Sequence, residues 1–214
     1  MDEDISIINS NTRNQKIKNL FVNNKKYFIS FLLLIILILF TYFTYSEFQD
    51  NKIKKLAHRY NDITINFKET NREKTKNQLV EIINEKNSTY SPLALYFIID
   101  NDIEESKEEI NKFFDIIINE VNLDKEIKNL VIYKKGLFNS SFADENKLIS
   151  ILNPIINSDS VWKAHALYLI AEYFFDKNEK QKSKEFFTKI LSNKKSNENI
   201  IKESQKRLKR DFSE

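Results

Sequence analysis

The 214-residue chain contains no cysteine, a single glycine and only two prolines. Without cysteine it can form no disulfide, and it offers neither a thiolate nucleophile nor a cysteine ligand for a metal. Gly136, Pro92 and Pro154 supply almost none of the turn residues that β-hairpins and β-sandwiches require. We therefore predict an all-α protein.

A strong excess of charge of one sign is also missing. The formal net charge is +3, and residues 1–26 contribute +2 of it, because five Lys and Arg face three Asp and Glu there. The remaining charge of about +1 is far below the basic excess that nucleic-acid-binding domains carry. We expect no nucleic acid among the partners.

Recognisable catalytic patterns are absent from the sequence. It contains no glycine-rich phosphate loop, no HExxH pattern and no Ser-His-acid constellation. The only histidines, His58 and His165, fall on separate predicted helices, and we interpret His165 as a residue of a helix–helix junction. The sequence therefore predicts a protein that is not an enzyme, with no catalytic residue, metal site or cofactor.

One uncharged segment dominates the N-terminal part of the chain. Residues 27–46 carry no charge, and thirteen of these twenty residues are Phe, Leu or Ile. A helix of this length reaches roughly 30 Å, the thickness of the hydrocarbon core of a bilayer. We predict a single transmembrane helix over residues 27–46, in contact with the lipid bilayer. A cleaved signal peptide is the alternative, but the run exceeds the roughly 7–15 apolar residues of such peptides and no Ala-x-Ala site follows it.

The charges beside this segment predict its orientation. Lys25 and Lys26 precede it, whereas Glu47 and Asp50 follow it, and basic residues favour the cytoplasmic side. Counted over a wider window the bias nearly disappears, because Lys52, Lys54 and Lys55 come next. We predict a short cytoplasmic tail at 1–26 and a periplasmic domain at 47–214, held at the bacterial inner membrane.

Apolar residues recur at helical spacing through residues 47–214. The clearest stripe runs from Ile110 to Val121, and another runs from Ile53 to Phe67 directly after the membrane segment. We expect helices to begin at Thr70, Ser91-Pro92, Asp102, Asp124 and Asp144, and to cover about 160–177, 179–193 and 200–211. The last helix is basic, and we expect it to be a solvated end cap, with a contact to anionic lipid as the alternative. Its basic residues are Lys202, Lys206, Arg207, Lys209 and Arg210.

The segment from Leu167 to Leu191 has the residue pattern of a tetratricopeptide repeat, with Asn178 in place of the usual turn glycine. Small side chains at Ala171 and Ser183 would let two helices approach, while Phe174 and Phe187 would fill the space beside them. We predict a tetratricopeptide-repeat-like array of antiparallel helix pairs over 47–214. The predicted packing residues are Leu167, Ile170, Ala171, Phe174, Ser183, Phe187 and Ile190.

This architecture resembles the YfgM-type ancillary subunits of the bacterial Sec translocon. The sharpest part runs from Leu148 to Leu191, where a Leu-x-Pro turn at Pro154 precedes a helix led by Trp162. The alanines of that helix are Ala164, Ala166 and Ala171, although the family's general richness in Gly and Ala is missing here. The resemblance implies a scaffold whose partners are Sec translocon subunits and periplasmic chaperones.

Two functions remain open from the sequence. Trp162, Tyr168 and Tyr173 would form a partner surface if they line a helical groove, and core packing is the alternative for each of them. The first function is a protein-binding scaffold anchored in the membrane. The second is a structural assembly or division factor of the cell envelope, in which the domain forms homo-oligomers.

Overall fold

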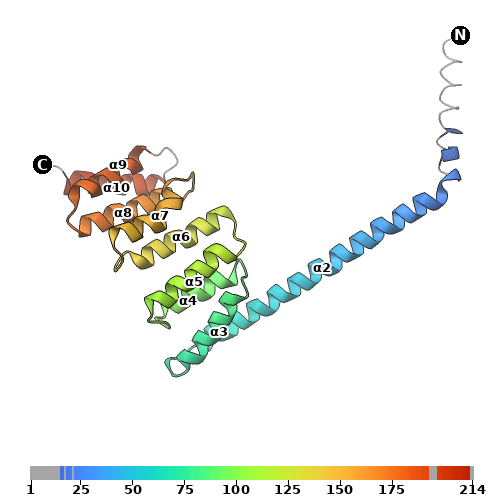
Figure 1. The fold of residues 1–214 in the computed structure, drawn as a ribbon, viewed down its shortest axis with the longest axis horizontal. Coiled ribbons are helices and arrows are strands. Elements are labelled where there is room, and N and C mark those ends of the chain that lie inside the picture. Colours follow the sequence, from blue (N-terminus) through green and yellow to red (C-terminus); the bar gives the residue numbers. More distant parts are fainter. Residues whose placement is uncertain (1–14, 17, 21, 193–196, 213–214) are drawn as a thin grey trace, which may run out of the picture. The chain divides into compact units, whose positions relative to one another are not determined.

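The computed structural model describes residues 15–16, 18–20, 22–192 and 197–212. These residues form helices and no strand, which confirms the predicted all-α class (Figure 1). The chain divides into two compact units, Met1–Leu56 and Ala57–Glu214. The elements are α2 (Lys25–Ile65), the 3₁₀ turn η1 (Glu69–Asn71), α3 (Arg72–Asn84), α4 (Tyr90–Asp100), α5 (Lys107–Glu120), α6 (Lys125–Asn139), α7 (Glu145–Ile156), α8 (Lys163–Asp176), α9 (Lys180–Ser192) and α10 (Glu198–Asp211).

Helix α2 contains the uncharged segment predicted from the sequence. It is long and apolar enough to span a membrane once, and none of its most apolar window is buried within the protein. Side chains such as Leu33 and Phe40 are more than half exposed. Exposure of this many apolar side chains is unfavourable in water and favourable in lipid. The helix continues past residue 46 without a break and ends at Ile65.

Three predicted helix starts are wrong, and the first of them is Ser91-Pro92. Ser91 lies inside α4 and does not cap it; its hydroxyl donates to the carbonyl oxygens of Ile82 and Ile83 at the end of α3. The Asn87 side chain instead accepts the bonds from the backbone N–H groups of Thr89 and Tyr90. That capping lets α4 begin at Tyr90, just before the predicted start.

The capping box predicted at Thr70 is also absent. Helix α3 follows η1 and begins at Arg72, and the Asn71 side chain accepts a bond from the backbone N–H of Lys68. Helix α5 is capped by Ser106 rather than by Asp102, since the Ser106 hydroxyl accepts the Glu109 N–H at 3.2 Å. The predicted starts at Asp124 and Asp144 are confirmed, because α6 and α7 begin one residue after them.

Three helices end in residues with left-handed backbone conformation, and none of these residues is glycine. They are Lys86 after α3, Asp102 after α4 and Asn178 after α8, with φ of 54°, 49° and 61°. After α8 the N–H groups of Asn178 and Glu179 donate to carbonyls in the last turn of the helix, at 2.9 and 2.8 Å. These two hydrogen bonds satisfy carbonyl groups at the end of the helix, and the chain reverses its direction there.

The single glycine lies inside α6, one turn before that helix ends at Asn139. A Cβ atom at Gly136 would lie 2.4 Å from Cδ2 and 2.9 Å from Cγ of Leu152, which is fully buried in α7. Such distances are too short for carbon–carbon contact. The missing side chain of Gly136 therefore permits the close packing of α6 on α7.

The sequence predicts a solvated end cap for the last helix. In the structure this helix is attached to its neighbour through a largely buried arginine. Arg207 of α10 is 11% exposed and lies 2.8 Å from Glu172 of α8 and 2.8 Å from Asp211. Its guanidinium group also lies 4.4 Å from the ring centroid of Phe175. Arg207 therefore joins α10 to α8 by both charge and aromatic contact.

Candidate functional site

The residues predicted to pack the repeat lie in the interior of α8 and α9. Leu167, Ile170, Ala171, Phe174, Ser183, Phe187 and Ile190 are all buried. The Ser183 hydroxyl donates to the Ala171 carbonyl oxygen at 2.8 Å. This bond links the two small positions and satisfies a hydroxyl that is completely buried.

The aromatic residues predicted as a partner surface contact different neighbours. Trp162 is half-buried and stacks on Tyr133 of α6, with ring centroids 5.7 Å apart. Tyr168 is also half-buried and meets Phe187 edge-on. Tyr173 is buried, and its hydroxyl donates to the carbonyl oxygen of Ala143 at 3.1 Å. Tyr173 thus fixes the turn between α6 and α7 and offers little surface to a partner.

His165 belongs to the same aromatic contact as Trp162. Its ring centroid lies 5.1 Å from that of Trp162 and 5.9 Å from that of Tyr133. Burial lowers the pKa of His165, and the backbone of Val161 partly offsets this shift. The neutral imidazole is therefore the form that this junction between α6 and α8 favours.

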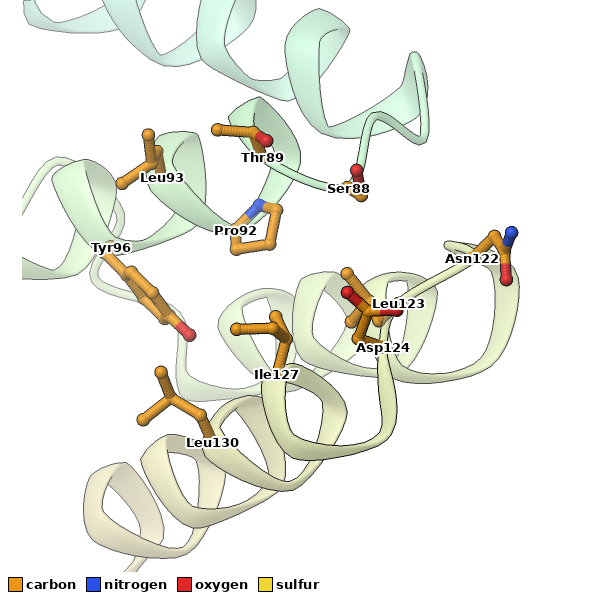
Figure 2. Close-up of a pocket in the computed structure, with 10 residues that line it drawn as sticks. All are labelled: Ser88, Thr89, Pro92, Leu93, Tyr96, Asn122, Leu123, Asp124, Ile127 and Leu130. Atoms are coloured by element: carbon orange, nitrogen blue, oxygen red, sulfur yellow. The ribbon is translucent and has the colours of Figure 1, made fainter.

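A more accessible surface lies between α4 and α6. A pocket of about 430 Å³ opens there, and in Figure 2 the side chains of Tyr96, Ile127 and Leu130 point toward one another across it. It is bordered by the turns that precede the two helices. Its lining consists of Ser88, Thr89, Pro92, Leu93, Tyr96, Asn122, Leu123, Asp124, Ile127 and Leu130.

A second pocket of about 160 Å³ continues along the same two helices. It shares Tyr96 with the first pocket and is otherwise lined by Ile99, Asp100, Phe114, Lys134, Leu137 and Phe138. Because the two pockets share a wall, we treat them as one feature and name their combined lining the α4–α6 groove. The floor of its second part is Phe114 of α5.

The α4–α6 groove exposes apolar side chains that could be buried by a partner. Leu93 is 39% exposed, Ile127 is 44% exposed and Leu137 is 46% exposed. Their helical spacing predicted apolar faces for these helices, but it could not reveal that these three side chains stay partly exposed in the described part of the chain. Exposed apolar residues gathered around a concavity are typical of protein interaction sites.

The polar groups of the groove are few. The hydroxyl of Tyr96 is buried and has no hydrogen-bond partner among the described residues, and burial raises its pKa to about 12. The Lys134 ammonium group lies 5.4 Å from the centre of the Tyr96 ring. Asp124 borders the first pocket and Asp100 borders the second. The groove thus combines apolar walls with a small number of polar groups.

A metal centre is not found in the part of the chain that the structure describes. Within those residues no three His, Asp or Glu side chains gather closely enough to hold a metal ion. The chain matches no protein-family model, no curated protein and no solved structure. The α4–α6 groove is therefore the candidate site on the evidence of its own geometry.

Proposed function

We propose that this protein is a non-enzymatic scaffold that is anchored in a membrane and binds other proteins through its helical domain. The observation that carries the proposal is the α4–α6 groove, where exposed Leu93, Ile127 and Leu137 surround a concavity. Helix α2 supplies the anchor. Anchoring raises the effective concentration of the domain beside the membrane, so that a weak interaction becomes productive.

The proposal includes a tetratricopeptide-repeat-like array of antiparallel helix pairs. Contacts between α8 and α9 support it, because Ala171 meets Ser183 whereas the earlier Tyr168 meets the later Phe187. In antiparallel neighbours, residues earlier in the first helix contact residues later in the second helix. The alternate helices α6 and α8 also contact near both their starts and their ends, through Glu126 with Ser160 and Tyr173 with Ala143.

For the partners, we propose Sec translocon subunits and periplasmic chaperones, on the basis of the resemblance to YfgM-type proteins. The corresponding location is the bacterial inner membrane, with residues 1–26 in the cytoplasm and the domain in the periplasm. A self-associating assembly or division factor is the competing function. An exposed apolar groove favours it equally, since a second copy of the chain could bury the same side chains.

The test is site-specific photo-crosslinking from the full-length chain in cells. A photoreactive residue replaces Ile127 in the groove, and the matched control replaces exposed Lys184 on α9. We expect Sec subunits or chaperones to be captured from position 127 and not from position 184. Capture of only further copies of the chain from position 127 would support the assembly factor instead.

A domain exchange separates the anchor from the array. Residues 47–214 are replaced by an unrelated periplasmic domain behind the same membrane segment. Loss of the captured partners is the expected result. Equal recovery of Sec components from both proteins would show that the helical domain is not the binding element.

A further inference from the structure

The α4–α6 groove runs along the full length of two helices that point the same way. The pocket beside the start of α4, at Thr89, also contains the start of α6, at Asp124. The pocket beside the end of α4, at Asp100, contains Leu137 in the last turn of α6. Helix α4 has 11 residues and α6 has 15, so the groove extends over about three to four helical turns, or roughly 16–22 Å.

Its shape suits a helix better than a small molecule. Helices α4 and α6 both pack on α5, which leaves a concavity between them. A helix laid between two others packs with its axis about 8–10 Å from each of them and inserts a row of apolar side chains. Ile127, Leu130 and Leu137 offer matching side chains along one face of α6.

The charge of the groove restricts its occupant further. Asp124 and Asp100 lie at its opposite ends, and neither carboxylate pairs with a cation among the described residues. Although Asp124 occupies the N-cap position of α6, its side chain makes no capping bond. Lys134 is the one cation of the lining, and it lies over the Tyr96 ring. The end at Asp124 is thus suited to positive charge on a partner, whereas at the other end Lys134 balances the charge of Asp100.

We propose that the occupant of the α4–α6 groove is an amphipathic helix of a partner protein, with its apolar face inserted and with Lys or Arg near the end that lies beside Asp124. This inference rests on the proposed scaffold function and specifies the chemistry of the segment that the scaffold binds. The binding mode is a helix in a groove, with apolar anchors one turn apart. Burial of Leu93, Ile127 and Leu137 supplies the affinity, and the Asp124 carboxylate selects the charge of the end beside it.

The test measures binding of two designed peptides to the full-length chain in nanodiscs of phosphatidylcholine. Each peptide is a labelled helix of about fifteen residues with leucines on one face. One ends in lysines and the other ends in glutamates. Fluorescence anisotropy with empty nanodiscs subtracts the binding of the peptides to lipid. The protein variants are Ile127→Ser, which removes an anchor, and Asp124→Lys, which reverses the charge at that end of the groove.

We expect the lysine-ended peptide to bind the unaltered chain, and Ile127→Ser to weaken it about tenfold. We expect the charge-reversed chain to prefer the glutamate-ended peptide. Equal binding of both peptides to all three chains would overturn the inference. Unchanged affinity of the lysine-ended peptide for the Ile127→Ser chain would overturn it as well. A crosslink to another protein from a position outside the groove, together with no peptide binding, would leave the scaffold function standing and remove the groove as its site.

Discussion

Gly136 has a packing role that its helix propensity opposes. Glycine inside a helix costs about 0.5–1 kcal/mol relative to alanine, but here the hydrogen replaces a methyl group that would collide with Leu152. The obstructing atoms include Cγ as well as the end of the side chain, and Leu152 is fully buried. Leu152 therefore cannot simply rotate into solvent to make room for a methyl group.

Gly136→Ala should destabilise the chain, since overpacking costs about 1–3 kcal/mol and exceeds the gain in helix propensity. In a Leu152→Ala background the same substitution should stabilise by about 0.5–1 kcal/mol, because the new methyl group enters the vacated space. Thermal unfolding of the four chains completes the double-mutant cycle. Additive effects would indicate that the two side chains do not compete for space.

His165 makes the stability of the α6–α8 junction depend on pH. Burial lowers its pKa, so the unfolded chain takes up a proton near pH 6.5 while the folded chain takes it up only at lower pH. The contribution of neutral His165 to the free energy of unfolding is complete above about pH 6.5 and is lost as the pH falls below this value. Stability therefore falls with acidification in this window.

Relative to a His165→Gln chain, the unaltered chain should lose stability between about pH 7 and pH 5.5. Carboxylate titration is common to both chains and cancels in the comparison. The measurement is the difference in unfolding midpoint between the two chains at each pH. A difference that stays constant across this range would contradict a lowered pKa of His165.

At the scale of elements, α10 depends on Arg207 for its attachment to α8. Arg207→Met should leave Glu172 without its cation, whereas Asp211 keeps its pair with Arg210. The cost should be about 1–3 kcal/mol, which is less than for a fully buried pair because Glu172 is 33% exposed. Arg210→Met is the matched control. Arg210 is 64% exposed, and its pair with Asp211 contributes little.

Hydrogen exchange of the α10 amides in the full-length chain measures this effect locally. Faster exchange over 198–211 is expected for Arg207→Met alone, with α6 and α7 unchanged. Equal protection of α10 in the two variants would show that its apolar contacts suffice to hold it.

Helical class and helix periodicity could be predicted because they depend on residues close in the chain. Sparse Gly and Pro excluded hairpins, and the stripe beginning at Ile110 identified α5. Helix starts were wrong where two candidate caps compete within a few residues, as with Asn87 against Ser91. Local sequence preference does not decide such a competition when one hydroxyl is required elsewhere by a tertiary hydrogen bond.

The groove could not be predicted in this way, because it forms where the tertiary packing leaves part of an apolar helix face exposed. Leu93 and Ile127 have the same spacing as residues that become buried. Periodicity identifies an apolar face but not the element that packs against it. Tyr173 shows the opposite case, because it was predicted for a partner surface and is buried. Its hydroxyl donates a hydrogen bond to a backbone carbonyl in the turn after α6 and is not available to a partner.

At the scale of the whole molecule, the prediction concerns topology. Lys25 and Lys26 precede the apolar segment of α2, so residues 1–26 should remain in the cytoplasm and the C-terminal domain should lie outside. Protease added to spheroplasts should digest a C-terminal tag and the domain while the N-terminal tail survives. A domain that is protected until the cells are lysed would reverse this topology.

The left-handed ends of α3, α4 and α8 have a consequence for thermal tolerance. An L-residue in this conformation costs about 1–2 kcal/mol, less for Asn and Asp, whereas glycine adopts it freely. Lys86→Gly should therefore raise stability by about 0.5–1 kcal/mol despite loss of its exposed pair with Glu120, and Asn178→Gly by a few tenths.

A higher melting temperature for Lys86→Gly than for Asn178→Gly is the expected order, and no gain from either would contradict it. Both substitutions lie outside the α4–α6 groove and leave its lining unchanged. Because the chain has almost no glycine, its helix ends are less stable to heat than they could be. Glycine at these positions should raise the melting temperature without altering the α4–α6 groove.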